Sequence, residues 1–249
     1  MKRVCLILSA VVVTSIILSS CGDGTSNQEG TSNQEGISYQ EGISYQEGTS
    51  NQEGTSNDVT IGKQVWMSKN LNVDKFRNGD PIPEVHTDAE WEAARKNKQP
   101  AWCNYDAQRI NNGSANGEKY GKLYNWYAVN DPRGLAPVGY HVPTDAEWTQ
   151  LTDFLGGESE AGGKMKSTSG WSLNGNGTNS SGFSGLPGGY RNSNGNFSGG
   201  IHGGDGYWWS STEGTSATAW NRYLYHVNGV VRRNKWYKGI GLSVRCLRD

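Results

Sequence analysis

The hydrophobic and polar positions divide the chain into three stretches with different patterns. Residues 4–18 form an almost unbroken apolar run behind two basic residues. This run is shorter than the roughly 20 residues that span a membrane, and it is typical of a signal peptide. The next stretch is almost entirely polar, and after it short apolar segments alternate with turns, as in a folded domain. We therefore expect a signal peptide at residues 1–20, a linker at 21–58 and one domain at 59–249.

Within the domain, one motif that occurs twice predicts two helices. Residues 87–91 and residues 144–148 both read TDAEW. Each is a capping box, in which Thr caps the first free amides and Glu, three positions later, accepts from the N–H of the cap; this explains the acidic residues more simply than an acid/base pair does. The first helix should end near Asn97 and the second at Gly156. The buried face of the second helix should carry Trp148, Leu151, Phe154 and Leu155.

Alternation and turn residues predict several short strands and a long loop region. Residues 59–67 alternate around Gly62-Lys63, which favours a hairpin, and Asn228-Gly229 favours a second hairpin with a type I′ turn. Residues 120–129 are aromatic enough to be buried, as a short helix or a strand. Residues 156–206 are rich in glycine and are expected to be loop. Further strands are expected at residues 207–212, 222–227, 230–236 and 244–247, the last of them beside the first hairpin.

Composition narrows the class of protein. Hydrophobic residues make up 34% and charged residues 19%, below the usual values of about 45–50% and about 25%. The chain contains 35 Gly, 10 Trp and 12 Tyr. No periodic stretch supports a coiled coil, no strict glycine period supports collagen, and a single apolar run argues against a polytopic membrane protein. An aromatic-rich, turn-rich domain remains.

Charge separates the linker from the domain. Residues 21–58 contain seven acidic residues and no Lys or Arg, whereas the domain has a net charge of +4. So small a positive charge without a clustered basic stripe argues against nucleic-acid binding. The densest basic group is interpreted as the polar face of a strand; it consists of Arg232, Arg233, Lys235 and Lys238.

The end of the apolar run indicates lipid attachment. Leu18-Ser19-Ser20-Cys21 resembles a bacterial lipobox, in which the Cys thiol receives a diacylglycerol and the Cys becomes the new N-terminus. An ordinary cleaved signal peptide is the alternative. The polar hexapeptides GTSNQE and GISYQE follow at once, which favours a lipoprotein with an extended, solvated linker. We expect Cys21 to anchor the protein to a membrane, the outer membrane of a Gram-negative bacterium.

Two further cysteines would remain in the processed chain. Cys5 belongs to the signal peptide, which leaves Cys103 and Cys246 in an oxidising compartment. A disulfide between them is the default expectation there. Two free thiols with redox or copper chemistry are the alternative.

Six ordered motifs carry a resemblance to a known family. They are VTIGKQVWMSKNLNV, YGKLYNWYAV, GYHVPTDAEW, GLPGGYR, YWWSST and SVRCLRD, spread over about residues 59–249. Together they resemble the Fibrobacter succinogenes major paralogous domain, which occurs on exported and lipid-anchored proteins. GYHVPTDAEW is also similar, more distantly, to the GxRLPTEAEWE motif of formylglycine-generating enzymes. The resemblance implies an α+β, C-type-lectin-like mixed fold with two main helices, short antiparallel strands and long glycine-rich loops.

The chain lacks the residue patterns of a known active site. Formylglycine-generating enzymes that bind copper use two cysteines close together late in the domain, and this chain has only Cys246 there. The four histidines lack the spacing of a zinc motif, and the lectin calcium motifs EPN and QPD are missing from the sequence. We expect no enzyme activity, no cofactor and no metal, with a structural calcium ion possible at loop oxygens around Asn104–Asn116 or Asp205.

The composition favours binding over catalysis. Sugar rings present apolar C–H faces that stack on aromatic rings, while loop amides and carboxylates bind the hydroxyl groups. We expect a lipid-anchored, non-catalytic binding or adhesion module for a glycan or a protein, presented on a flexible stalk. The alternatives are an oxidoreductase like the formylglycine-generating enzymes and a purely structural envelope component. The residues expected at the ligand are Trp171, Asp205, Tyr207, Trp208, Trp220, Asn221 and Tyr237.

Overall fold

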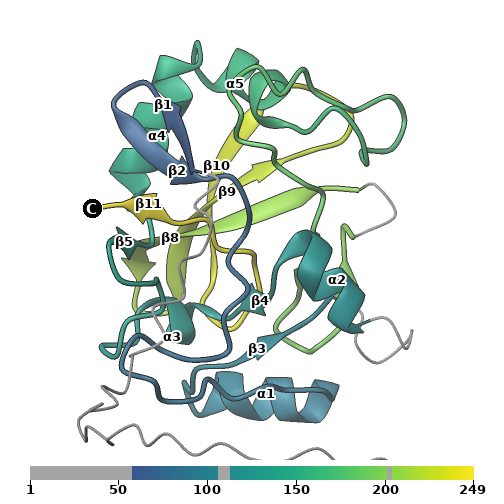
Figure 1. Cartoon of the computed structure of the whole chain (residues 1–249). Helices are drawn as coiled ribbons and strands as arrows, with labels where there is room; N and C mark the ends of the chain where they lie inside the picture. The colour runs from purple at the N-terminus through teal and green to yellow at the C-terminus, as the bar shows by residue number, and fades with distance from the viewer. Residues whose placement is uncertain (1–57, 106–112, 201–203) are drawn as a thin grey trace, which may run out of the picture. The chain divides into compact units, whose positions relative to one another are not determined.

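The computed structural model describes residues 58–105, 113–200 and 204–249, which form an α+β structure (Figure 1). Within these residues there are five helices and eleven strands, so the mixed class is confirmed, with three helices more than the sequence predicted. No helix in the described ranges is long and apolar enough to cross a membrane. The expected signal peptide, Cys21 and the linker up to residue 57 lie outside the described residues, whereas Asp58, the last residue assigned to the linker, begins the first strand.

Both predicted helices are confirmed, together with their caps. Helix α1 spans Asp88–Lys96 and helix α4 spans Asp145–Phe154. Thr87 and Thr144 are the N-caps, and both capping boxes are complete: each Thr hydroxyl accepts from a backbone N–H, and the Glu side chain accepts from the N–H of the Thr. The local motif therefore determines where each helix begins.

Helix α5 (Glu158–Met165) lies in the glycine-rich stretch that was expected to be loop. Glycine weakens a helix by about 1 kcal/mol relative to alanine, and the local pattern therefore favoured a loop. In the structure the glycine serves packing, because a Cβ atom on Gly162 would lie only 2.5 Å from the carbonyl oxygen of Gly229. Tertiary contact therefore outweighs helix propensity here.

The two remaining helices are short. Helix α2 spans Gly113–Tyr120 and helix α3 spans Trp126–Val129. Strand β4 (Leu123–Tyr124) comes directly before α3, so residues 120–129 contain both a strand and a helix. The side chains of Tyr124, Trp126 and Val129 are buried, as the aromatic pattern predicted.

Four strands form the sheet that contains the predicted N-terminal hairpin. Strand β1 (Asp58–Ile61) pairs with β2 (Gln64–Met67), and the turn between them uses Gly62 at φ +63°, a value that favours glycine. Strand β11 (Leu247–Arg248) lies beside β2, which confirms the predicted place of the C-terminal strand, and β5 (Tyr140–His141) completes the sheet.

The buried face of α4 differs from the prediction at one position. Trp148, Leu151 and Leu155 are buried, but Phe154 is 63% exposed. Its ring lies against the β1–β2 turn, where a Cβ atom on Gly62 would be 2.9 Å from the ring. The prediction for Phe154 is therefore wrong, because the last turn of α4 extends past the core and over the hairpin.

The second sheet has the order β10-β9-β8. Strand β8 spans Gly206–Thr215, β9 spans Thr218–Leu224 and β10 spans Val231–Tyr237. The β9–β10 hairpin is confirmed, but Leu224 pairs with Val231, so the connection is longer than the predicted two-residue turn. The Asn228 side chain instead accepts from the N–H of Val230 within a wider loop. Two small sheets pair β3 (Trp102–Cys103) with β4 and β6 (Tyr190–Arg191) with β7 (Phe197–Ser198).

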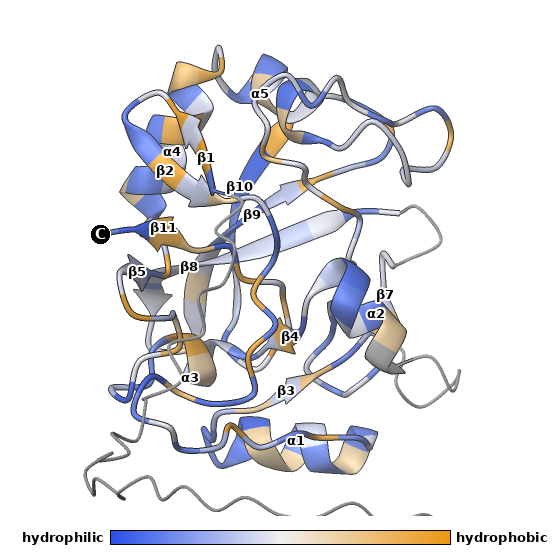
Figure 2. Cartoon of the chain, viewed as in Figure 1, coloured by the Kyte–Doolittle hydropathy of each residue, from blue (hydrophilic) through white to orange (hydrophobic). Residues whose placement is uncertain are grey.

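Buried side chains form three clusters, and Figure 2 shows the apolar colour of β4 and β11, which between them contribute to all three. One cluster contains four packed rings, which we call the aromatic quartet: Trp66, Trp148, Phe183 and Trp208. Neighbouring ring centroids in it lie 4.8 to 6.5 Å apart. Aromatic rings thus fill the space that aliphatic side chains fill in most domains.

Candidate functional site

Five aromatic side chains form a continuous patch on one face of the β8–β9–β10 sheet. Because side chains alternate between faces along a strand, Tyr207 of β8, Tyr223 of β9 and Trp236 of β10 point to the same face. Tyr190 of β6 and Tyr225, which follows β9, extend the patch through ring contacts. We call these five residues the aromatic platform.

The rings of the platform hold one another in place. The rings of Tyr207 and Tyr223 stack with centroids 5.6 Å apart, and Trp236 lies 5.0 Å from Tyr207. Tyr190 meets both Tyr207 and Trp236 edge to face at 5.0 Å, and Tyr225 meets Tyr223 in the same way at 5.0 Å. Such pairs contribute about 0.5–1.5 kcal/mol each beyond the area they bury. The platform is therefore preorganised.

The platform lies between the core and the solvent. Tyr207 is 5% exposed and forms its inner part. The rings of Tyr190, Tyr223 and Trp236 pack against the largest core cluster but remain half-buried, and Tyr225 is also half-buried. Four rings thus keep accessible surface, which the aromatic quartet does not.

Polar groups border the platform. The Arg232 guanidinium lies 5.7 Å from the centre of the Tyr225 ring, and the Asn234 side chain hydrogen-bonds to Tyr223. The Tyr207 hydroxyl donates to Asp205 Oδ2 at 3.1 Å. Burial raises the pKa of Tyr207, and the Asp205 carboxylate raises it further. The Tyr207 hydroxyl therefore stays protonated and can donate this hydrogen bond at neutral pH.

This arrangement suits a ligand with apolar faces and polar edges. Half-exposed rings provide flat apolar surface, while an arginine, an asparagine and tyrosine hydroxyls provide hydrogen bonds at the border. Binding sites generally combine aromatic surface with a few placed polar groups. Within the described residues, no group of three or more His, Cys, Asp or Glu side chains could hold a metal ion. The platform therefore has the features of a binding surface.

Two of the residues expected at the ligand lie in the core. Trp171 and Trp208 are buried, and both belong to the cluster of the aromatic quartet. The Trp171 indole donates to the Gly185 carbonyl, and the Trp208 indole donates to the Asn70 side chain. With their rings covered and their N–H groups paired, they cannot contact a ligand, and the prediction is wrong for both.

The remaining predicted residues lie on both sides of the sheet. Tyr207 belongs to the platform and Asp205 borders it. Trp220 lies on the opposite face with the Arg233 guanidinium 3.6 Å from its ring centre, and alternation places Tyr237 on that face too. Asn221 is fully buried and donates to the Asn234 carbonyl. The seven residues therefore do not form one site.

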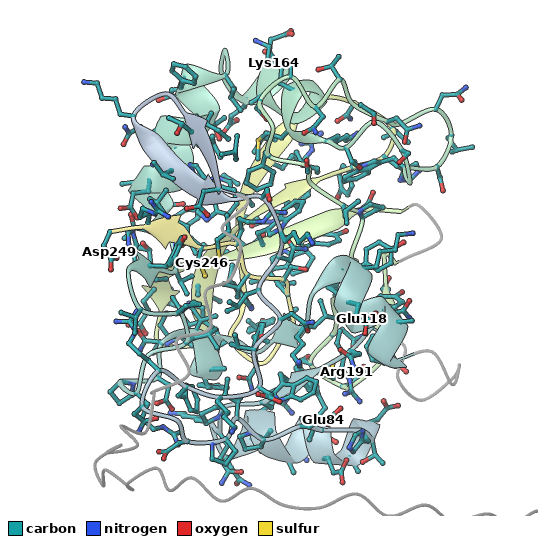
Figure 3. The ribbon with its side chains drawn as sticks, viewed as in Figure 1. Glu84, Glu118, Lys164, Arg191, Cys246 and Asp249 are labelled. Carbon is teal, nitrogen blue, oxygen red and sulfur yellow. The ribbon has the colours of Figure 1, made fainter. Side chains whose placement is uncertain are left out.

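The expected disulfide is not present in the structure, in which Cys103 and Cys246 are both free thiols. They lie in different core clusters: Cys103 beside Arg191, and Cys246 next to β11, in a separate region of Figure 3. Burial raises the pKa of Cys103 to about 11 and that of Cys246 to about 12. Both thiols are therefore protonated and unreactive at neutral pH.

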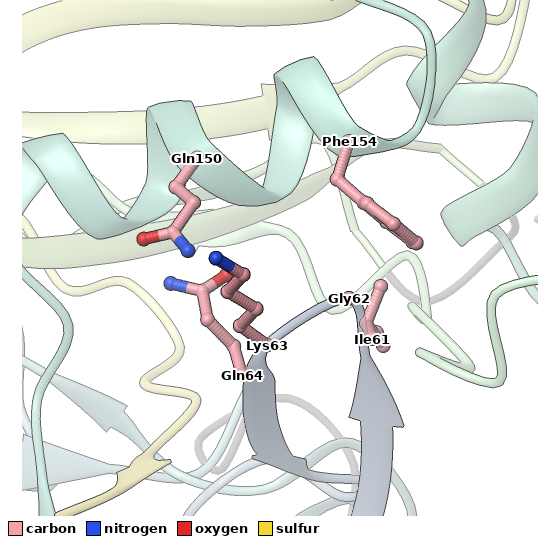
Figure 4. A pocket seen from close by; sticks show the side chains of 6 residues that line it. All are labelled: Ile61, Gly62, Lys63, Gln64, Gln150 and Phe154. Carbon is pink, nitrogen blue, oxygen red and sulfur yellow. The ribbon is translucent and has the colours of Figure 1, made fainter.

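A groove on the other sheet is a second candidate. A pocket of about 540 Å³ lies between the β1–β2 turn and α4 (Figure 4). It shares Lys63, Gln64 and Gln150 with a neighbouring pocket of about 350 Å³ that is also lined by His141. His141 lies between Glu147 and Asp249, at 3.0 and 2.8 Å, which ties α4 to the C-terminus. These contacts give His141 the structural role of a tether.

Sequence reasoning missed four platform residues: Tyr190, Tyr223, Tyr225 and Trp236. Alternation within the predicted strands placed Tyr223 and Tyr225 on one face, and this signal was present in the sequence. The register that brings Trp236 onto the same face depends on the hairpin loop, and Tyr190 comes from a separate small sheet. Neither contact was visible in the local pattern.

Comparison with known proteins gives one match. A family model described as the Fibrobacter succinogenes major domain matches residues 59–248. No curated protein and no solved structure matches the chain.

Proposed function

The chain belongs to the Fibrobacter succinogenes major domain family, and from this premise we propose that it is a lipid-anchored cell-envelope protein that binds carbohydrate on its aromatic platform. One observation carries the proposal: four half-exposed rings in mutual contact, bordered by Arg232 and Asn234. A sugar ring would stack its C–H face on these rings, while its hydroxyl groups would bond to the polar border.

The sequence supports the lipid anchor and the distance from the membrane. Cys21 ends a lipobox-like motif, and the acidic polar repeats that follow separate it from the domain. A Cys21→Ser variant should lose its acyl chains and move from the detergent phase to the aqueous phase on phase separation. Retention in the detergent phase would contradict the anchor.

The fold and the thiols support a binding role rather than catalysis. We propose a C-type-lectin-like arrangement in which α1 and α4 are the two main helices and long loops connect the strands. A copper site of the formylglycine-generating type needs two thiolates in one place. Here Cys103 and Cys246 lie in separate clusters, and burial favours their protonated forms.

A glycan array tests the proposal, and the chain provides its own control. The full-length protein should bind at least one oligosaccharide, and Tyr223→Ala and Trp236→Ala should each weaken that binding at least tenfold, or about 1.4 kcal/mol. Tyr237 is 64% exposed and lies on the opposite face, so Tyr237→Ala should change the binding constant less than about twofold, which is within about 0.4 kcal/mol.

Two results would overturn the proposal. One is the lack of any oligosaccharide ligand on a broad array. The other is an equal loss of binding in the platform variants and in Tyr237→Ala, because that loss could not come from the platform.

A further inference from the structure

A polar pocket of about 210 Å³ lies where α5, the loop at residues 173–176 and the β9–β10 loop meet. Its lining includes Lys166, Leu173, Asn176, His226 and Asn228. The Asn176 side-chain oxygen accepts from the N–H of Trp171, and the Asn228 side-chain oxygen accepts from the N–H of Val230. Because these bonds use the amide oxygens, the side-chain NH2 groups of Asn176 and Asn228 are the donors that this pocket offers to a ligand.

Lys166 brings a buried positive charge to the pocket. The residue is 2% exposed, and its ammonium group donates to the carbonyl oxygens of Gly175 and Asn228, both of which line the pocket. The ammonium also lies 4.7 Å from the centre of the Trp171 ring. The cation is thus held at the pocket wall by neutral groups.

No carboxylate of the described residues forms an ion pair with Lys166. The carboxylate that acts on it electrostatically is Asp205, and this group already binds Tyr207 and His226. Burial without a counter-ion lowers the pKa of Lys166 to about 8. A buried charge is costly unless it is paired, so an anion in the pocket would supply the partner that the fold does not.

The rim of the pocket is exposed and apolar. Leu173 is 80% exposed and Val227 is also exposed. The backbone at Leu173 and Asn174 has positive φ values of +50° and +59°, which non-glycine residues seldom adopt and which cluster at functional sites. The loop therefore holds an apolar side chain at the mouth of a cationic pocket.

The pocket adjoins the aromatic platform. Asp205 accepts from the Tyr207 hydroxyl with one carboxylate oxygen and from the His226 backbone and ring with the other. Tyr207 belongs to the platform and His226 lines the pocket. A single carboxylate therefore links the two surfaces.

We propose that this pocket binds the carboxylate of a sugar acid at Lys166, next to neutral sugar residues that stack on the platform. The part of this inference that concerns the neutral sugar residues rests on the proposed function of the platform. Binding of the sugar acid in the pocket does not depend on it. The Asn side-chain amides would bind the hydroxyl groups of the acidic residue, and Leu173 and Val227 would cover its apolar face.

The test is an NMR titration of the full-length protein with free glucuronate and, in parallel, with glucose. Glucuronate should shift the amide signals of the pocket, and Lys166→Met should weaken its binding at least about tenfold, as expected for loss of a charge-assisted hydrogen bond. Lys164 is the matched control, because it lies in the last turn of α5, two residues before Lys166, and its ammonium binds the Leu155 carbonyl; Lys164→Met should leave the binding unchanged.

A second series protects the test against misfolding of Lys166→Met. Because Leu173 is exposed, Leu173→Glu and Leu173→Lys should fold normally. Both variants lose the same leucine contact, so comparing them isolates the charge. A charge about 7 Å from the ligand in water changes affinity by about two- to threefold, so the Glu variant should bind glucuronate more weakly than the Lys variant, while the two variants should bind glucose equally.

The outcomes separate the pocket from the platform. Equal binding of glucuronate and glucose, or no effect of charge at position 173, would overturn the inference while leaving the platform untouched. Glucuronate binding that needs Lys166 but not Tyr223 would support the pocket. If neutral oligosaccharides failed to bind at the same time, only the proposed function of the platform would be overturned.

Discussion

The aromatic quartet and the aromatic platform are built from the same kind of residue at similar spacing. Ring centroids lie 4.8 to 6.5 Å apart in the quartet and 5.0 to 6.2 Å apart in the platform. The quartet is covered on every side, whereas the platform is covered on one side only. Aromatic content alone therefore does not identify a binding site. Whether other elements cover the rings determines whether a ligand can reach them.

What covers the quartet is visible in its contacts. Trp148 comes from α4 and donates its indole N–H to the carbonyl oxygen of Trp209 in β8, so the helix closes over the sheet. Arg245 lies over the Phe183 ring and donates to the Phe183 carbonyl. Tyr223 and Trp236 instead remain half-buried, so their face keeps contact with solvent.

The largest expected effect follows from removing a quartet ring. Trp148→Ala should lower the free energy of unfolding by about 3–5 kcal/mol, because it leaves a cavity that the neighbouring rings cannot fill. Urea unfolding of the full-length protein measures this change. Trp220→Ala is the control, since Trp220 is half-buried on an open part of the sheet; an equal loss in both variants would break the distinction between covered and open rings.

A smaller effect is expected at the ion pair that fixes α4 over the quartet. Asp145 binds Arg222 and Arg233 of the sheet, and although burial opposes its ionisation, the hydrogen bonds from the arginines hold its pKa below the usual value. Asp145→Asn should cost about 1–3 kcal/mol because the buried Arg222 guanidinium loses its charged partner. Asp88→Asn in the other TDAEW helix is the comparison. Its carboxylate is 50% exposed and makes a single 3.3 Å contact with the buried Arg191, so its loss should cost less than the loss of the several Asp145 bonds.

The same pair predicts a pH dependence. A carboxyl group with a lowered folded pKa adds stability above its unfolded pKa of about 3.9, and this stability is lost as the pH falls through the folded pKa. The difference in unfolding free energy between the native protein and Asp145→Asn should therefore shrink below about pH 4. A difference that stays constant down to pH 2 would contradict this assignment.

A platform ring should contribute less to stability than a quartet ring. Tyr223→Ala should cost at most about 1.5 kcal/mol, since its ring is half-buried and chiefly loses contacts with other platform rings. Thermal and urea unfolding check this expectation. A loss as large as that of Trp148→Ala would mean that the platform is part of the core and not a binding surface.

The smallest expected effect concerns His141 at the C-terminus. Burial lowers its pKa, but hydrogen bonds to Asp249 and Glu147 outweigh this, so the pKa is raised. The group therefore adds stability below its unfolded pKa of about 6.5, and this contribution disappears as the pH rises through the folded pKa. His141→Gln should be less stable than the native protein at pH 5 and equal to it at pH 9. A difference that is unchanged between these pH values would contradict the ion pair.

The sequence predicted the features that depend on neighbours along the chain. The TDAEW motifs determined the starts of α1 and α4, and alternation determined the hairpins. It did not predict α5, because Gly162 is required by its distance to Gly229, a contact between distant segments. The predicted disulfide between Cys103 and Cys246 failed for the same reason. The oxidising compartment and the number of cysteines do not show which core cluster each cysteine joins.

The candidate site was only partly predictable for a related physical reason. Composition indicated aromatic binding, and the list included Tyr207 and Asp205, which belong to the platform and its border. It also included Trp208, because a tryptophan beside a glycine-rich loop has the same local sequence whether or not another element covers it. Coverage is a tertiary property, and the register of β10 that aligns Trp236 with Tyr207 is one as well.

The indole N–H signals of the full-length protein provide the most direct test of carbohydrate binding on the platform. Adding an oligosaccharide that the array identifies should shift the signal of Trp236 while the signal of Trp208, buried in the quartet, stays in place. A shift at Trp208 without one at Trp236, or no indole shift at saturating ligand, would contradict the account.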